Sequence, residues 1–171
     1  LFHATNSYFI PNVEVTAFSC KTNLPPNTAF RGFGGPQGMF VIEAAISHAA
    51  NELKISSGEI QEKNLLKNGD EFPYGQIADK VEAGNTWQTA KHKFDLEKLE
   101  KGIVTFNNEN EHFRKGISMM PVSFGISFTK TEMNHARALV HIYQDGSIGV
   151  STGAVEMGQG VNMKILRVAE Q

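Results

Sequence analysis

The sequence predicts an α+β fold, because its helical and strand-like segments are partly segregated along the chain. The clearest helical pattern lies in the first half, over residues 39–53, where apolar residues recur at intervals of three or four. Strand-like segments dominate the second half, and two of them flank an Asp-Gly pair at 145–146. A doubly wound sheet would instead need strands and helices in regular alternation.

The size and composition are those of one folded domain without a nucleic-acid or membrane partner. The chain has 171 residues, of which 40% are hydrophobic and 20% charged, and this is enough apolar material for a buried core. Its formal charge of -2 lacks the basic footprint of a nucleic-acid-binding protein. No apolar run approaches the ~20 residues that a transmembrane helix needs.

The cysteine and histidine content excludes two further kinds of site. Cys20 is the single cysteine, so the chain holds neither a disulfide framework nor a Cys-built zinc site, and a reducing cytoplasm is its simplest location. The six histidines form no zinc-binding motif.

Both ends of the sequence predict a fragment. The chain begins with Leu1 rather than Met, and it ends at Gln171 within a helical pattern that no Gly or Pro closes. We therefore expect residues 1–171 to be a single fragment of one larger domain. The alternative is a complete domain released from a tag.

The first half is predicted to hold extended segments and then helices. Residues 9–18 have the alternating and β-branched character of strands. A helix is predicted from Pro36, which suits a first helical turn, to Leu53. A second helix is predicted to begin at the capping box of Ser56 and to end near Gly69.

The middle and the second half continue this pattern. A loop over 70–84 is predicted to precede a charged helix over 86–101, and a polar loop is expected at 107–112. Alternating apolar residues predict a strand over 117–128. The remaining expected elements are a hairpin of strands 139–143 and 147–152, and a helix after Gly160 with Val161, Ile165 and Val168 on its inner face.

Two glycine-rich turns are candidate ligand sites. Residues 31–35 (Arg-Gly-Phe-Gly-Gly) precede a helix, where glycines allow close backbone approach and free amides attract anions. The third glycine of a dinucleotide fingerprint is missing, because Gln37 stands in its place. Residues 156–160 (Glu-Met-Gly-Gln-Gly) join a strand to a helix and offer similar amides. The alternative for each segment is an ordinary structural turn.

Three segments, taken together, resemble one family closely. Residues 20–38, residues 124–129 (Phe-Gly-Ile-Ser-Phe-Thr), and residues 139–147 followed by 156–160 are similar, in this order, to molybdenum-site segments of the xanthine dehydrogenase/aldehyde oxidase family. Residues 1–3 (Leu-Phe-His) are similar as well, so the resemblance spans nearly the whole chain.

This resemblance implies part of the molybdopterin-binding domain of a molybdenum hydroxylase, with mixed sheets and packed helices. Such enzymes insert a water-derived oxygen into a C–H bond of a heteroaromatic ring. The implied substrates are purines, with hypoxanthine and xanthine oxidised to urate. The implied cofactors are molybdenum-molybdopterin in this part, and iron–sulfur clusters, FAD and NAD on other domains or subunits, which are the implied partners.

The resemblance also implies roles for individual residues. Phe33 and Phe128 would stack on the two faces of the purine, and Thr129 would hydrogen-bond its edge. Arg31 would lie beside molybdenum. The pterin and its phosphate would be lined by Met157, Gly158 and Gln159.

The resemblance leaves the catalytic base outside this chain. The family's glutamate base would lie beyond Gln171, and neither Glu43 nor Glu156 matches it by motif. Without a positioned base, the chain alone is expected to be inactive.

One residue departs from the family's pattern. Lys130 follows the Phe-Thr pair, where an aliphatic residue is usual. Two alternatives therefore stay beside a purine hydroxylase: an aldehyde oxidase or other heteroaromatic hydroxylase, and a non-catalytic interaction domain on the same scaffold.

Overall fold

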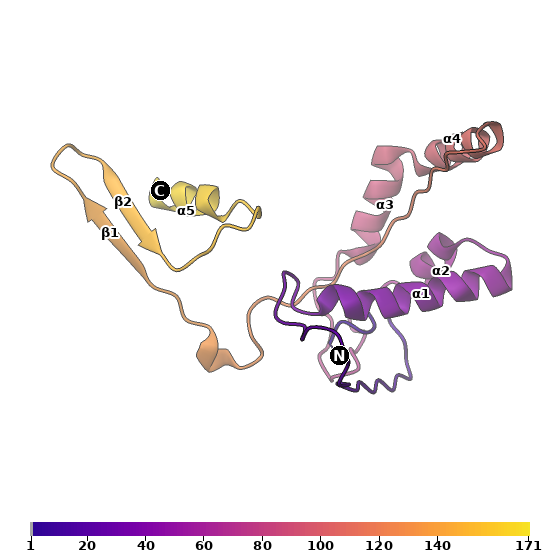
Figure 1. The fold of residues 1–171 in the computed structure, drawn as a ribbon, viewed down its shortest axis with the longest axis horizontal. Coiled ribbons are helices and arrows are strands. Elements are labelled where there is room, and N and C mark those ends of the chain that lie inside the picture. The colour runs from indigo at the N-terminus through magenta and orange to yellow at the C-terminus, as the bar shows by residue number, and fades with distance from the viewer. Residues whose placement is uncertain (1) are drawn as a thin grey trace. The chain divides into compact units, whose positions relative to one another are not determined.

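A computed structural model describes residues 2–171, so Leu1, the first residue of one matched segment, lies outside the described residues. The chain forms two compact units, an N-terminal unit up to Phe124 and a C-terminal unit from Gly125 to Gln171. Together the described residues hold five α-helices and a two-stranded antiparallel sheet (Figure 1), which agrees with the predicted α+β class.

The longest helix, α1, spans Gly35–Leu53 and confirms the strongest helical prediction. A proline stands in its first turn, as expected. The helix ends at Lys54, which adopts a left-handed conformation (φ 57°) and donates its backbone N–H to the carbonyl of Ala50. Its buried side is formed by Gly35, Met39, Ile46 and Ala50.

The second helix, α2, spans Ser57–Lys63 and begins at the predicted cap, where Ser56 Oγ accepts the backbone N–H of Glu59 at 3.1 Å. The predicted end near Gly69 is wrong. After Lys63 the chain turns to pair with the N-terminal segment: Phe9 N–H donates to the carbonyl of Asn64, and Leu66 N–H donates to that of Ser7, both at 2.9 Å. These bonds to a distant segment replace the last turns of the expected helix.

The charged helix predicted over 86–101 is two helices, α3 (Ala83–Phe94) and α4 (Leu96–Glu109). The break is at Asp95, whose φ of 47° is left-handed, a conformation that Asp tolerates better than most residues. Helix α4 also runs into the segment expected as a loop from residue 107.

The core of the N-terminal unit joins these helices to the segment that contains Tyr8. Tyr8, Ile46, Leu65 and Trp87 are buried together. The partly buried hydrophobic side chains that pack against this cluster are Ile10, Ile42, Ile60, Ala83 and Met119.

Neither strand predicted in the N-terminal unit is formed as expected. Most of residues 9–18 have no strand pairing and are largely exposed. In the segment predicted as a strand over 117–128, side chains take the place of a partner strand: Asn6 Nδ2 donates to the carbonyl of Pro121 at 2.7 Å, and Gln61 Nε2 donates to that of Met119 at 3.0 Å. Buried backbone groups need such partners when no sheet supplies them.

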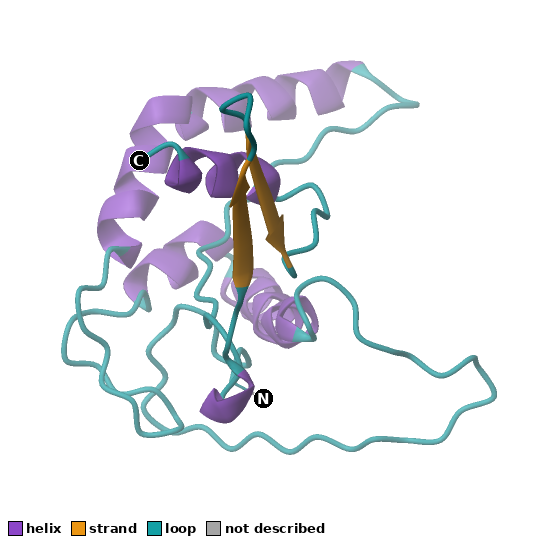
Figure 2. Ribbon diagram, turned by 90° about the vertical axis from the view of Figure 1, so that its left-hand side faces the viewer, coloured by secondary structure: helices purple, strands orange, loops and turns teal. Residues whose placement is uncertain are grey.

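The C-terminal unit contains the predicted hairpin and helix (Figure 2). Strands β1 (Ala138–Ile142) and β2 (Ile148–Thr152) are antiparallel, with Val140 opposite Val150. Their turn uses Gly146 at φ 83°, as the Asp-Gly pair predicts. A short 3-10 helix spans Thr131–Met133, and α5 spans Val161–Ala169. Within residues 125–171, all of which are described, no residue is fully buried.

In the part of the chain that the structure describes, none of the helices has the length and apolar character needed to cross a membrane.

Candidate functional site

The first candidate turn is a run of three left-handed residues that leads into α1. Gly32, Phe33 and Gly34 have φ values of 94°, 47° and 86°. The turn is closed by two backbone hydrogen bonds, from Phe33 N–H to the carbonyl of Phe30 at 2.8 Å and from Gly35 N–H to that of Gly32 at 2.9 Å. The fold thereby leaves the Phe33 ring 71% exposed, on the same turn as Arg31.

This turn is sterically demanding at two positions. A Cβ on Gly32 would lie 2.8 Å from the ring of Pro36, so only glycine fits there. Phe33 has no such freedom, and a bulky residue at positive φ costs on the order of 1 kcal/mol. Strain of this kind persists where the surroundings enforce it, and it often accompanies a binding site.

Three of the segments that carry the resemblance meet at the start of α1. Gly35 has room for no side chain, because a Cβ there would overlap the ring of Phe124. That ring also lies against His3, with ring centroids 4.6 Å apart. A Cβ on Gly38 would lie 3.3 Å from the backbone of His3. The structure therefore packs residues 3, 35–38 and 124 together around one aromatic ring.

The predicted aromatic-hydroxyl pair lies in the C-terminal unit. Phe128 is 50% exposed and Thr129 is exposed. Ser127, just before them, is left-handed (φ 70°). Asn134 binds both backbone groups of Phe128: its Oδ1 accepts the N–H at 2.8 Å, and its Nδ2 donates to the carbonyl at 2.7 Å. Asn134 was not predicted from the sequence, where the only signal was an Asn near a turn.

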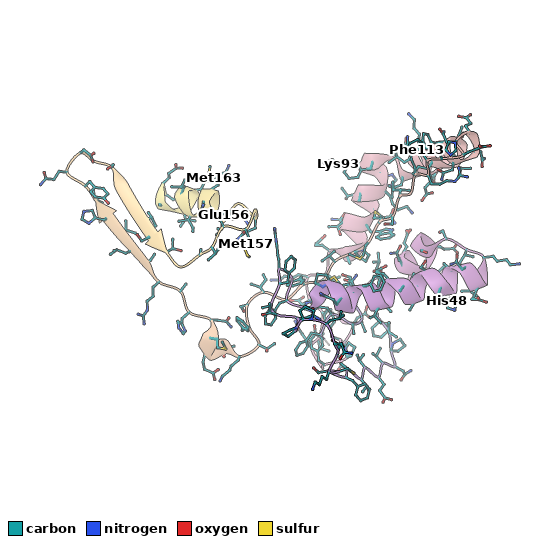
Figure 3. The ribbon with its side chains drawn as sticks, in the orientation of Figure 1. His48, Lys93, Phe113, Glu156, Met157 and Met163 are labelled. Atoms are coloured by element: carbon teal, nitrogen blue, oxygen red, sulfur yellow. The ribbon has the colours of Figure 1, made fainter. Side chains whose placement is uncertain are left out.

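The second candidate turn precedes α5 (Figure 3), and its side chains bind its own backbone. Gln159 Oε1 accepts the N–H of Met157 at 2.6 Å, and Gln159 Nε2 donates to the carbonyl of Val155 at 2.7 Å. Glu156 Oε1 accepts the N–H groups of Gly158 and Gly160, both at 2.9 Å.

One sequence-based prediction about the second turn is wrong, because the carboxylate of Glu156 binds its backbone amides. The amides of this turn were expected to be free for an anion, but those of Gly158, Gly160 and Asn162 already donate to Glu156. Hydrogen bonds from Asn162 and then Gly160 hold the pKa of the Glu156 carboxyl below its usual range. The loop geometry suits an anion, and the anion bound here is a side chain of the chain itself.

The predicted site residues therefore form two groups. Arg31 and Phe33 share one turn of the N-terminal unit. The others belong to the C-terminal unit: Phe128, Thr129, Met157, Gly158 and Gln159. Among residues 2–171, no group of three or more His, Cys, Asp or Glu side chains is placed to hold a metal ion.

The donor groups of each turn, taken separately, fit a pterin-type cofactor in kind. Left-handed glycines at 158 and 160 are typical of backbone that approaches an anionic ligand closely, although here the N–H groups of both donate to Glu156. Arg31 offers a guanidinium, whose planar donors suit oxygen-rich anions.

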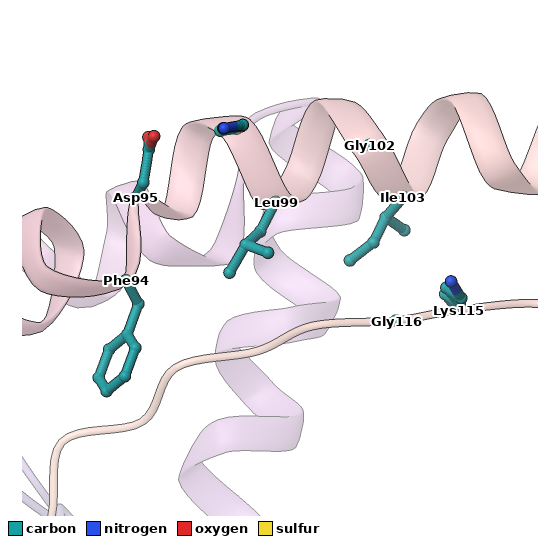
Figure 4. A pocket seen from close by; sticks show the side chains of 8 residues that line it. Phe94, Asp95, Leu99, Gly102, Ile103, Lys115 and Gly116 are labelled. Atoms are coloured by element: carbon teal, nitrogen blue, oxygen red, sulfur yellow. The ribbon is translucent and has the colours of Figure 1, made fainter.

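A separate open cavity lies between α4 and residues 115–116 (Figure 4). Its volume is about 720 Å³. Its lining includes Phe94, Leu99 and Ile103, and it contains none of the predicted site residues. The charged residues Asp95, Lys98 and Lys115 line it as well, so its lining is mixed rather than purely apolar.

Comparison with known proteins matches the chain to molybdopterin cofactor-binding domains. One family model of this description matches residues 1–65, and a second matches residues 89–171.

Proteins with similar sequences include xanthine dehydrogenases and a xanthine dehydrogenase/oxidase. A xanthine dehydrogenase of Oryza sativa subsp. japonica is 46% identical over 169 residues, which is 99% of this chain and 12% of that protein. A xanthine dehydrogenase of Dictyostelium discoideum is 41% identical, with the same coverage. A xanthine dehydrogenase/oxidase of Felis catus is 42% identical over 171 residues, 100% of this chain and 13% of that protein. The chain thus spans about an eighth of the length of these relatives.

Proposed function

The chain belongs to the molybdopterin cofactor-binding domain family, as a segment of the xanthine dehydrogenase type, and on this basis we propose that it forms part of the molybdenum site of a purine hydroxylase. The observation that carries the proposal is the turn at 31–35, which carries both Arg31 and an exposed, left-handed Phe33. The identity to xanthine dehydrogenases over the whole chain supports it.

In this proposal the chain's own residues bind the purine ring and orient it. Phe33 and Phe128 stack on the purine faces, which excludes water from the ring and is worth ~1–3 kcal/mol per stacked ring. Thr129 fixes the orientation of the ring through a hydrogen bond to its edge.

The same proposal assigns the cofactor contacts. Arg31 lies beside the metal, and Met157, Gly158 and Gln159 hold the pterin. When bound, the molybdenum cofactor supplies the two-electron oxidation that accompanies insertion of a water-derived oxygen into the ring.

The rest of the enzyme is proposed to lie outside these residues. Iron–sulfur clusters, FAD and NAD would be held by other domains or subunits, and the glutamate base would lie beyond Gln171. The mixed sheets expected of the molybdopterin-binding domain would be completed by residues of that domain outside 1–171. A cytoplasmic location fits the free, exposed thiol of Cys20, because reducing compartments preserve such thiols.

A second function in the same class is favoured by Lys130. This cation directly follows the Phe-Thr pair, and it could select a substrate other than a purine. The second candidate is therefore an aldehyde oxidase or another heteroaromatic hydroxylase.

The experiment compares substrates and ring variants in the full-length protein. Wild-type protein is expected to oxidise xanthine and hypoxanthine in preference to an aromatic aldehyde. Phe33→Ala is expected to lower kcat/KM for xanthine by about 10- to 100-fold, the range that loss of one stacked ring implies. Phe18→Ala, at an exposed ring outside both candidate turns, is the matched control and should match wild type.

The outcomes separate the alternatives. Preference for the aldehyde would favour the second candidate. Wild-type protein without molybdenum would favour a non-catalytic domain, and unchanged kinetics in Phe33→Ala would remove the proposed stacking role.

A further inference from the structure

The carboxylate of Glu156 spans the loop that precedes α5. Its Oε1 accepts the N–H groups of Gly158 and Gly160 at 2.9 Å each, and its Oε2 accepts the N–H of Asn162 at 3.1 Å. One side chain thus joins three backbone amides spread over five residues, and reaches into the first turn of the helix.

This carboxylate replaces a cap that the helix lacks. Gly160 is the N-cap residue of α5 and has no side chain with which to cap it. A helix N-terminus leaves N–H groups unpaired unless a nearby acceptor binds them. Glu156 supplies that acceptor from four residues upstream, and its negative charge is favourable at this end of the helix.

The same bonds set the backbone of the segment assigned to the pterin. Gly158 and Gly160 are both left-handed, with φ values of 91° and 75°, and both donate to the same oxygen. Gln159 lies between them, and its side chain ties Met157 to Val155. Removing Glu156 would release two flexible glycines on either side of Gln159.

We propose that Glu156 is a positioning residue for the cofactor, which fixes residues 157–160 in the conformation that holds molybdopterin. The inference rests on the proposed function, because it takes Met157, Gly158 and Gln159 as the pterin-binding residues.

The bonding of Glu156 argues against a direct catalytic role. A general base needs a pKa near the working pH. Both oxygens of Glu156 accept hydrogen bonds from the backbone, and these bonds hold its pKa below the usual range. This agrees with a catalytic base located outside the chain.

A competing role is that of a placeholder. In that case the anionic cofactor would displace the carboxylate and take over its three amides. The two roles predict opposite effects when the carboxylate is removed. Loss of a positioning residue weakens cofactor binding, whereas loss of a placeholder strengthens it.

The test uses the full-length protein with two variants and one control. Glu156→Ala removes all three bonds. Glu156→Gln keeps one oxygen for Gly158 and Gly160 but turns an NH₂ group toward the N–H of Asn162. Glu132→Gln removes an exposed carboxylate elsewhere in the same unit. The readouts are molybdenum by elemental mass spectrometry, pterin by fluorescence, and the thermal midpoint of cofactor-depleted protein.

Glu156→Ala is expected to retain at least about 10-fold less pterin and molybdenum after dialysis, which corresponds to loss of charge-assisted bonds. The cofactor content of Glu156→Gln is expected to lie between those of Glu156→Ala and wild type. The cofactor content of Glu132→Gln is expected to equal that of wild type. The thermal midpoint of cofactor-depleted Glu156→Gln should stay near that of wild type, which a merely structural role would not predict.

Four results would overturn the inference. Wild-type cofactor content in folded Glu156→Ala would exclude a positioning role, and higher content would assign the placeholder role instead. If Glu156→Ala fails to fold, wild-type retention in Glu156→Gln would exclude the positioning role equally. Absence of molybdenum and pterin from the wild-type protein would overturn the proposed function, and this role with it.

Discussion

Asn134 holds Phe128 by both polar groups of its backbone, accepting its N–H at 2.8 Å and donating to its carbonyl at 2.7 Å. The pairing closes the loop around the 3-10 helix Thr131–Met133. It fixes the backbone of Phe128 directly after the left-handed Ser127. The ring proposed to stack on the substrate is therefore attached to a backbone that a single side chain fixes.

Asn134→Asp is expected to raise KM for xanthine by about 5-fold, with a smaller change in kcat, in the full-length protein. The carboxylate can still accept the N–H of Phe128, but it cannot donate to the carbonyl and places an oxygen against it. Steady-state kinetics measure both constants. Asn51→Asp, on the exposed surface of α1, is the matched control. An unchanged KM in Asn134→Asp would mean that this clamp does not support substrate binding.

Tyr8 is expected to make the stability of the protein fall at alkaline pH. Its ring is 2% exposed, and its hydroxyl donates to Glu43 Oε1 at 2.7 Å. Burial, followed by the hydrogen bond to Glu43, raises the pKa of Tyr8 well above its usual value. The folded state therefore keeps this proton at a pH where the unfolded state loses it, so stability is retained below pH ~10 and lost as pH rises further.

Urea unfolding of wild type and Tyr8→Phe between pH 8 and pH 11 tests this dependence. Tyr8→Phe should be less stable at pH 8, because Glu43 loses a donor. The difference in the free energy of unfolding between wild type and Tyr8→Phe should narrow by up to ~1.4 kcal/mol per pH unit above pH ~10. Tyr143→Phe, at an exposed ring, should show no such change. A difference that stays constant across this range would contradict the assignment to Tyr8.

Gly35→Ala is expected to destabilise the N-terminal unit by ~1–3 kcal/mol, the usual cost of overpacking. The added methyl group would overlap the ring of Phe124, which also packs against His3. Gly102→Ala in α4 is the matched control, because a Cβ there meets nothing within 4 Å and alanine favours a helix by up to ~1 kcal/mol. The two variants should shift the thermal midpoint in opposite directions, and a stabilised Gly35→Ala would contradict the close packing.

Sequence patterns correctly predicted the elements that interactions between neighbouring residues stabilise. Helix α1 follows from apolar periodicity behind a proline, and the hairpin follows from an Asp-Gly pair between apolar runs. The early end of α2 and the irregular path of residues 117–124 follow instead from distant partners. Asn6 binds the carbonyl of Pro121, 115 residues away, and no window of sequence contains both.

In the candidate site, too, the backbone turns were predicted but the side-chain partners were not. The glycines of both turns indicate where the backbone bends, and their left-handed conformations agree with that prediction. The side chains that fix the second turn and the backbone of Phe128 were not predicted. Glu156 was identified only as part of the second turn and as a residue that does not match the catalytic base, and Asn134 looks like any polar loop residue. Their function depends on hydrogen bonds to the backbone of nearby residues, which residue type alone does not reveal.

Residues 125–171 are expected to be largely unfolded as an isolated peptide. No residue of this unit is fully buried, and both strands of its hairpin carry exposed apolar side chains, Leu139 at 68%, Ile142 at 69% and Ile148 at 54%. A lone two-stranded hairpin and a nine-residue helix are each marginal in water. Circular dichroism of the peptide should show little helix, whereas proteolysis of the full-length protein should leave this segment intact. A cooperatively folded peptide would mean that the hairpin and α5 stabilise each other without the rest of the protein.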